Sequence, residues 1–376
     1  MKAVRLALVA ALTLSSLRAE LVEARSAVAS AGRPSTGSGR TAAGWGGTAD
    51  AQVVVAVDAV ARRYGLAGEV LVARGGRVLL DKGYGTIRPA GGASHRAGER
   101  WRLASITKQV TATLVVRRLA PDPAARSLPA ALDATYPGAA LISATSSALT
   151  MRQLLTHHSG LANPDNTPAG VDGVPASYTR PTPDVGTCIS KPANPGAPFS
   201  YNNCDYIMLA EAYRAANAPS GDFAWPRGMA MARSGQMGVP GFVGGNAEPR
   251  FQLSSFGAAG GLIGTARAVF HFDRSLMTGR LLPPAALAEL WKPEGGGSYQ
   301  ALGQWVFPGR LAGCAQPKRI VQRDGEIYGV QARNFILPDD DLVVVFFTNR
   351  SSDDFKIGEV WQQSGFAYDL LSAAAC

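Results

Sequence analysis

The sequence predicts a mixed α/β (α+β) fold, with one antiparallel sheet built from both chain ends, flanked by helices and carrying an inserted helical lobe. Three observations predict it. A helix pattern followed by a hairpin pattern opens the ordered part, and four strand-like runs with a final helix close it. The middle of the chain is rich in Pro and Gly, with short helical stretches and no convincing strands. We therefore expect a sheet domain from 50–120 and 255–376, with a mainly helical, loop-rich lobe at 121–254.

The N-terminal 49 residues have the composition of an export signal and a leader. Lys2 and Arg5 precede an apolar stretch from 6 to 14, and small residues follow by Ala19, which predicts a signal peptide at 1–19. The segment 20–49 is rich in Ala, Gly, Ser and Arg and predicts a flexible leader. We therefore expect a periplasmic or secreted protein. No segment approaches the roughly 20 apolar residues of a membrane helix, so no stable membrane span is expected.

The first ordered elements are a helix and a hairpin. From Asp50 to Gly65, apolar residues recur at helical spacing: Val53, Val57, Val60 and Tyr64. The runs 69–73 and 77–80 are rich in β-branched and apolar residues and are separated by Gly75-Gly76, a dipeptide that tolerates the positive φ of a tight hairpin. These features predict a helix followed by two antiparallel strands.

The last part of the chain repeats the strand pattern. Four runs predict strands, and they are 302–307, 320–323, 331–337 and 342–348. A helix is predicted over 355–371.

Charge and cysteine content narrow the class of protein. The net charge is +9, but the first 49 residues hold six basic and two acidic residues, and no basic run occurs elsewhere, so nucleic-acid binding is not expected. Four histidines and no C-x-x-C pair provide few possible zinc ligands, and neither a metal nor an organic cofactor is expected.

The four cysteines, an even number, fit disulfides in an exported protein, and four free thiols are the alternative. Of three possible connectivities we favour Cys188–Cys204 with Cys314–Cys376.

One short motif predicts a catalytic serine and its base. A serine hydroxyl needs a neighbouring base, which is either a histidine or a lysine of lowered pKa. The elbow pattern G-x-S-x-G of triad hydrolases is absent, whereas S-x-x-K occurs once, as Ser105 to Lys108. The segment that follows has helical spacing, so both side chains lie on one face. The motif therefore predicts Ser105 as the nucleophile and Lys108 as its base.

The surroundings of this motif resemble a known family. The segment 101–109, WRLASITKQ, is similar to the nucleophile segment of class C β-lactamases, DD-peptidases and related esterases. The segment 154–161, LLTHHSGL, and Tyr201-Asn202-Asn203 resemble later elements of that family in the same order. The resemblance covers roughly 50–371 and implies a β-lactamase/transpeptidase-like fold. It also implies that Tyr201 relays protons and that Asn203 holds the substrate's amide.

Other family elements are expected to be structural. His157 and His158 are given no catalytic role and are expected to pack beside a helix that Gly160 caps. The segments GGLIGTA (260–266) and LGQW (302–305) resemble a helix start and a strand of the family.

The strand segment expected to line the site opposite Ser105 departs from the family pattern. Where relatives carry K-T-G or H-x-G, this chain has Arg323-Asp324-Gly325-Glu326. Arginine can grip a carboxylate but cannot give up a proton, so anion binding is kept and proton transfer is lost. Gly325 lets the backbone approach the substrate. By resemblance, the N–H of Glu326 joins that of Ser105 in an oxyanion hole. The alternative for Arg323 is an ion pair with a surface acid.

These features together predict an exported serine hydrolase that forms an acyl-enzyme. The substrate would be a small molecule or peptide with an amide or ester bond, such as a β-lactam, a D-amino-acid peptide or a short-chain ester. Arg323 indicates a substrate carboxylate. The alternative is a non-catalytic sensor or binding protein of the same fold, and the change at Arg323 is its best support. The sequence predicts no oligomeric state.

Overall fold

The computed structural model describes residues 46–120, 127–136, 149–216 and 222–376. The expected signal peptide (1–19) and nearly all of the expected leader (20–49) lie outside the described residues. Helix α2 begins at Gly46, so the last four residues assigned to the leader are helical instead. Residues 46–49 are Gly, Gly, Thr and Ala, which show no amphipathic pattern, so the predicted boundary fell too late.

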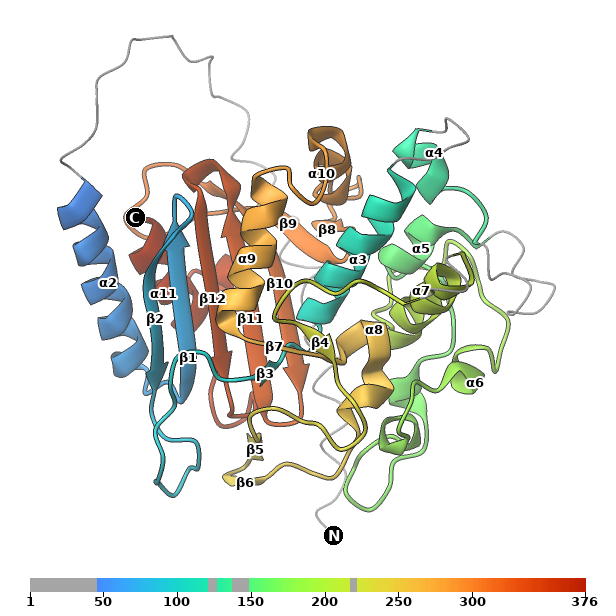
Figure 1. Ribbon diagram of the computed structural model, residues 1–376, viewed down its shortest axis with the longest axis horizontal. Helices are drawn as coiled ribbons and strands as arrows, with labels where there is room; N and C mark the ends of the chain where they lie inside the picture. The colour runs from blue at the N-terminus through green and yellow to red at the C-terminus, as the bar shows by residue number, and fades with distance from the viewer. Residues whose placement is uncertain (1–45, 121–126, 137–148, 217–221) are drawn as a thin grey trace.

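A seven-stranded antiparallel sheet lies at the centre of the described chain (Figure 1). Its order is β2-β1-β12-β11-β10-β9-β8, so strands from the two chain ends become neighbours where β1 pairs with β12. The strands are β1 (Gly68–Arg74), β2 (Arg77–Tyr84), β8 (Gln300–Ala301), β9 (Gln304–Gly309), β10 (Lys318–Ile327), β11 (Val330–Leu337) and β12 (Leu342–Thr348). The sheet predicted from both chain ends is confirmed.

Helices cover both faces of the sheet. Helices α2 (Gly46–Arg63) and α11 (Phe366–Ala375) pack against each other over one face. On the other face lie α3 (Ile106–Leu119) and α9 (Ala266–Met277) (Figure 1). Every residue of β12 is therefore buried, and alternate residues enter opposite cores. A strand covered on both sides reads as a continuous apolar run, as the sequence of β12 does.

In the range 121–254, the described residues form short helices joined by long loops. The helices are α4 (Leu128–Leu132), α5 (Met151–Leu155), α6 (Val185–Cys188) and α7 (Asn203–Ala216), with 3₁₀ turns at Pro164–Asn166 and Ala176–Thr179. A further 3₁₀ turn at Leu253–Phe256 leads into helix α8 (Gly257–Gly260), which lies beyond the predicted boundary. Helix α7 contacts α3, α5, α6 and α8, and so joins the lobe to the nucleophile helix. Helix α10 (Pro284–Leu290) follows α9 and contacts α3 and α4.

The expectation that 121–254 holds no strands is wrong in detail. Short strands β4 (Ala230–Met231), β5 (Phe242–Val243) and β6 (Asn246–Ala247) lie there. Strand β4 pairs with β7 (Leu262–Gly264), which also pairs with β3 (Trp101–Arg102). Two-residue strands are too short to show an alternating pattern, so periodicity cannot predict them.

Two predicted elements differ at their boundaries because of residues with positive φ. The run 302–307 is interrupted at Gly303, whose φ of 78° makes the turn between β8 and β9. The predicted helix 355–371 begins only at Phe366, because Gly358, Gln363 and Gly365 have φ of 73°, 52° and 94°. Positive φ is incompatible with a continuing right-handed helix. Helix α11 then runs on to Ala375.

Within the described residues, no helix combines the length and apolar character needed to cross a membrane.

Candidate active site

Ser105 stands at a tight turn that leads into helix α3. Ala104 before it has a φ of 46°, a strained conformation for a residue with a Cβ. Tertiary contacts hold the turn, since Leu103 N–H donates to Leu262 O of β7 at 2.8 Å. Ser105 occupies the N-cap position but makes no side-chain capping hydrogen bond. Its hydroxyl is therefore left for other partners.

Lys108, one helical turn later, is completely buried and reaches that hydroxyl. Its Nζ lies 3.2 Å from Ser105 Oγ, 2.6 Å from Asn203 Oδ1 and 2.8 Å from Ala259 O. Burial holds the pKa of Lys108 well below its usual range, and the positive charge of Arg323 lowers that pKa further. A neutral amine has two N–H groups and one lone pair. The two carbonyl oxygens accept the N–H groups, which leaves the lone pair for Ser105.

Tyr201 approaches the nucleophile from the lobe. Its hydroxyl oxygen lies 2.5 Å from Ser105 Oγ and accepts a hydrogen bond from Arg323 Nη2 at 3.0 Å. Burial raises the pKa of Tyr201 to about 12, while Arg323 and the Ser105 hydrogen bond act in the opposite direction. Tyr201 is therefore protonated at neutral pH and can donate a proton.

Arg323 lies in β10, on the edge that faces the nucleophile. Strand β9 pairs with β10 only as far as Gln322, so the segment from Arg323 onward extends beyond it. Arg323 is 1% exposed, and its Nε donates to Ser105 O at 3.0 Å. Its Nη1 is buried without a hydrogen-bond partner among the described residues. The structure places the guanidinium against the nucleophile turn and Tyr201, not against a surface acid.

Gly325 and Glu326 follow on the same strand. A Cβ built on Gly325 would lie 2.9 Å from both Leu103 O and Ser105 N, so only glycine allows this contact between β10 and the nucleophile turn. The side chain of Glu326 is exposed, and its Oε1 accepts a weak hydrogen bond from Ser352 N–H at 3.3 Å. The backbone of this segment lies beside Ser105 N–H, where an oxyanion hole is expected.

Asn203 is the first residue of α7 and is 6% exposed. Its Oδ1 accepts the hydrogen bond from Lys108, and its Nδ2 donates to Tyr178 Oη at 2.8 Å and lies 3.4 Å from Asp165 Oδ1. The amide is thus engaged inside the protein, and its expected contact with a substrate amide stays a prediction. Sequence reasoning did not find Tyr178, Asp165 or the carbonyl of Ala259, because none stands in a recognisable motif.

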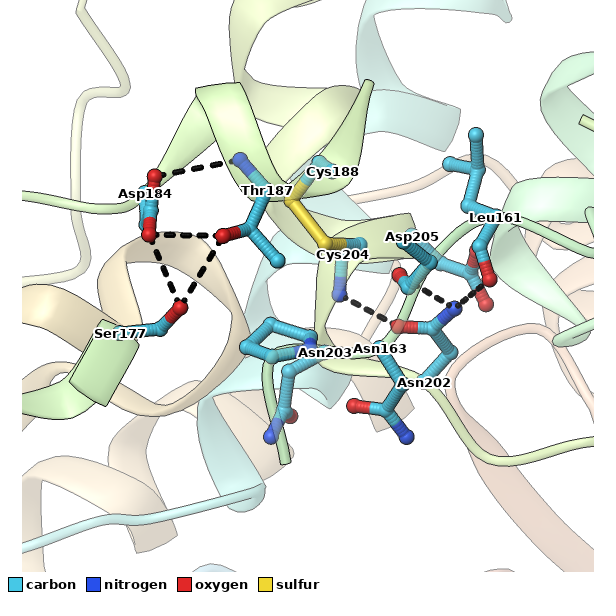
Figure 2. The surroundings of a disulfide bond; sticks show 12 residues. Leu161, Asn163, Ser177, Asp184, Thr187, Cys188, Asn202, Asn203, Cys204 and Asp205 are labelled. Carbon is cyan, nitrogen blue, oxygen red and sulfur yellow. Dashed lines mark hydrogen bonds between the residues drawn. A yellow bond between two sulfur atoms is a disulfide. The ribbon is translucent and has the colours of Figure 1, made fainter. Parts of the chain in front are cut away.

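The Cys188–Cys204 disulfide stabilises the start of α7. It joins α6 to the residue after Asn203, with 5.2 Å between the two Cα atoms (Figure 2). Asn202 adds a cap, since its Oδ1 accepts from Cys204 N–H at 2.8 Å and its Nδ2 donates to Leu161 O at 3.0 Å (Figure 2). These contacts fix the backbone that carries Tyr201 and Asn203.

The second disulfide joins Cys314 to Cys376 at the end of α11, away from the site. Both bonds have the pairing favoured from the sequence.

His157 supports the site from behind. Its Nδ1 lies 2.8 Å from Asp205 Oδ2, and its ring centroid lies 4.7 Å from that of Tyr201. Burial lowers the pKa of His157 and raises that of Asp205, because it disfavours the charged form of each group. Helix α5 ends at Leu155 and His157 itself has a φ of 62°, so the expected cap at Gly160 lies three residues too late. The contacts of the His157 ring stabilise this conformation.

His158 lies beside it, with Nδ1 2.6 Å from Ala197 O and Nε2 3.1 Å from Glu294 Oε2. Among the described residues, no group of three or more His, Cys, Asp or Glu side chains is arranged to hold a metal ion.

Comparisons with known proteins agree with this architecture. Residues 51–225 match the family model described as Beta-lactamase. No curated protein sequence matches the chain. The solved structure of FmtA from Staphylococcus aureus is similar, with a TM-score of 0.65 and 15% identity over 86% of this chain and 89% of that one.

Two further solved structures are similar. D-amino acid amidase from Ochrobactrum anthropi SV3 has a TM-score of 0.63 and 18% identity, over 87% of this chain and 98% of the amidase. SurE, crystallised with D-Leu, has a TM-score of 0.61 and 22% identity, over 87% of this chain and 76% of SurE. At these identities the structural similarity shows the fold. Together with the match of residues 51–225 and the arrangement of helices around the antiparallel sheet, it shows that the chain has the fold of the serine β-lactamases and penicillin-binding-protein-like proteins.

Proposed function

We propose that this protein is a serine hydrolase that works through an acyl-enzyme on Ser105, with Lys108 as the base. The observation that carries the proposal is the position of Ser105 Oγ, between Lys108 Nζ at 3.2 Å and Tyr201 Oη at 2.5 Å. A base with a lowered pKa and a protonated phenol on the two sides of one hydroxyl are the groups that acyl transfer requires.

In the acylation step, the Ser105 hydroxyl gives its proton to the lone pair of Lys108 as its oxygen attacks the substrate carbonyl. The carbonyl oxygen becomes negative and accepts hydrogen bonds from the N–H groups of Ser105 and Glu326. Tyr201 then donates its proton to the leaving group, and the proton held by Lys108 restores the tyrosine. Water attacks the ester on Ser105 with the same groups acting in reverse, which releases the acid.

Arg323 contributes charge to this step, not proton transfer. Its guanidinium lowers the pKa of Lys108 and stabilises negative charge on the Tyr201 oxygen through the 3.0 Å hydrogen bond. The residue is nearly inaccessible, which supports an action on these two side chains over the expected grip on a substrate carboxylate. The proposed substrates are amides or esters, among them D-amino-acid amides and peptides, β-lactams and short-chain esters. The likeness to a D-amino acid amidase supports an amide.

We further propose that the protein is exported to the periplasm or secreted. Two disulfides support this, because such bonds persist in oxidising compartments.

The test is turnover of p-nitrophenyl acetate and nitrocefin by the purified mature protein, by Ser105→Ala and by Ser364→Ala. Ser364 is exposed and lies just before α11, so its variant controls for loss of a serine elsewhere. We expect turnover by the wild type and by Ser364→Ala, and none by Ser105→Ala. Equal turnover by Ser105→Ala would remove Ser105 from the mechanism. Slow acylation without release of product would instead make the protein a binding or sensor member of the family.

A further inference from the structure

A chain of polar contacts continues from Lys108 through Asn203 to the surface of the lobe. Asn203 Nδ2 donates to Tyr178 Oη at 2.8 Å, and Tyr178 O–H donates to Asp165 Oδ1. Tyr178 is 2% exposed, and its ring is stacked on Phe256 with 4.0 Å between centroids. Asp165 is exposed, in the 3₁₀ turn Pro164–Asn166. The acid-base machinery is thus connected to two residues to which the proposed mechanism gives no role.

The direction of this chain is fixed by its two ends. At one end the Arg323 guanidinium can only donate, and at the other the Asp165 carboxylate can only accept. If Asp165 accepts from the Tyr178 hydroxyl, the Tyr178 oxygen must accept from Asn203 Nδ2. The amide oxygen of Asn203 then faces Lys108 and accepts one of its N–H groups. The hydrogen bonds therefore all run one way, from Arg323 through Tyr201 and Ser105 to Lys108, Asn203, Tyr178 and Asp165.

The order of these bonds matters because the Asn203 amide can turn over. Exchange of its nitrogen and oxygen needs only rotation about its last side-chain torsion. In the exchanged state the amide N–H groups would face the N–H groups of Lys108, two sets of donors without an acceptor between them. Lys108 would then lose one of the two carbonyl oxygens that direct its lone pair toward Ser105.

We propose that Tyr178 and Asp165 are positioning residues, which hold the Asn203 oxygen toward Lys108 and thereby direct the lysine lone pair at the Ser105 hydroxyl. The inference rests on the proposed acyl-enzyme function. This positioning role accounts for the hydrogen bond that Asn203 Nδ2 donates to Tyr178 inside the protein. Asn163 attaches the same turn to the site, since its Nδ2 donates to Tyr201 O at 3.1 Å and its Oδ1 accepts from Asp165 N–H at 3.1 Å.

The charges around Lys108 predict the direction in which its pKa should shift when one of them is removed. Arg323 lowers the pKa of Lys108, whereas three acids raise it, each from a different part of the fold, and they are Asp165 of the 3₁₀ turn, Asp324 of β10 and Asp205 of α7. The other titratable groups that face the amine are Tyr201, Tyr206 and His157. Removal of the Asp165 charge would therefore lower the pKa of Lys108 and move the acid limb of the pH–rate profile to lower pH.

The experiment measures acylation of Ser105 by p-nitrophenyl acetate, as burst rate against pH, in the full mature protein. The variants are Tyr178→Phe, which keeps the stacked ring, and Asp165→Asn, which lies on an exposed turn. Matched controls are Tyr64→Phe, which breaks a Tyr–Asp hydrogen bond of 2.6 Å to Asp369 between α2 and α11, and Asp172→Asn, an exposed loop aspartate of the same lobe. Thermal unfolding of each variant reports whether it is folded.

We expect Tyr178→Phe to lose about tenfold or more in acylation rate, the effect of one lost hydrogen bond to a buried group. Asp165→Asn keeps an oxygen that can accept from Tyr178 O–H, so its acylation rate should fall less than that of Tyr178→Phe. Asp165→Asn should also move the acid limb to lower pH, and the controls should match the wild type. The position of the limb does not depend on the amount of folded enzyme, so a less stable variant still gives a result.

Wild-type rates and an unmoved limb in both variants, with Ser105 still acylated, would overturn the positioning role and leave the proposed function intact. An effect confined to the KM of substrates that carry an amine would assign Asp165 to substrate binding and also overturn it. If the wild type is not acylated at all, the proposed function fails, and this inference fails with it.

Discussion

Replacement of Gly325 by alanine tests whether close packing of β10 against the nucleophile turn is needed for catalysis. The added Cβ would lie 2.9 Å from Leu103 O and Ser105 N and 3.0 Å from Ala104 Cβ. Two of these three neighbours are backbone atoms, so the contact cannot be relieved by rotation of a side chain. Either β10 or the turn at Ala104 must move.

The expected losses of unfolding free energy and of kcat both follow from this geometry. Overpacking of one methyl group costs about 1–3 kcal/mol of unfolding free energy. Displacement of Ser105 N–H from the reacting carbonyl removes one oxyanion-hole donor, which costs about 10²–10³ in kcat. We therefore expect a large loss of kcat in a protein that still folds, because the strain is concentrated at the catalytic turn.

The assay compares kcat for p-nitrophenyl acetate with the free energy of unfolding in urea. Gly295→Ala is the matched control, since a Cβ at Gly295 meets no atom within 4 Å and its φ is not positive. That variant should stay within about 0.5 kcal/mol of the wild type, with unchanged kcat. A Gly325→Ala protein with wild-type kcat would show that this contact does not position Ser105 for catalysis.

Three further predictions concern the base, the fixed charge and the disulfides. Lys108→Met keeps the volume but removes the base, so kcat should fall about 10²–10⁴-fold in the ester assay, and a smaller loss would favour another base. Arg323→Met removes a charge that lowers the pKa of Lys108, so that pKa should rise and the acid limb of kcat/KM should move to higher pH; a move to lower pH would contradict the electrostatic role. For the disulfides, the chain-entropy model gives about 3 kcal/mol for the 16-residue separation of Cys188–Cys204 and about 4 kcal/mol for the 62-residue separation of Cys314–Cys376. Urea unfolding of the two Cys→Ser double variants should show this order, and only the loss of Cys188–Cys204 should also lower turnover, because that bond stabilises the start of α7.

The sequence predicted the features that depend on periodicity and spacing. The hairpin of β1 and β2, strand β12 and helix α3 follow from apolar patterns, and Ser105 and Lys108 meet because three residues make almost one helical turn. Tyr201 and Arg323 lie 96 and 218 residues beyond Ser105, and their hydrogen bonds to it follow from the tertiary fold. Only resemblance to a family indicated that they belong to one site.

The features that were missed depend on contacts that leave no local pattern. The late start of α11 is set by positive φ at Gly358, Gln363 and Gly365. The full burial of Arg323 could not be read from its strand, because the polar residues Gln322 and Asp324 stand on either side of it. Tyr178 and Asp165 are single polar residues in short 3₁₀ turns, and the hydrogen bonds that connect them to Asn203 follow from the tertiary fold.

The central claim is that Ser105 is the nucleophile, and the most direct measurement is the site of covalent modification. The mature protein is treated with a fluorophosphonate, digested with trypsin and analysed by tandem mass spectrometry, in which residues 103–108 (LASITK) form one peptide. We expect one adduct in that peptide, on Ser105, and none in the Ser105→Ala protein. An adduct on another residue, or equal labelling of Ser105→Ala, would contradict it.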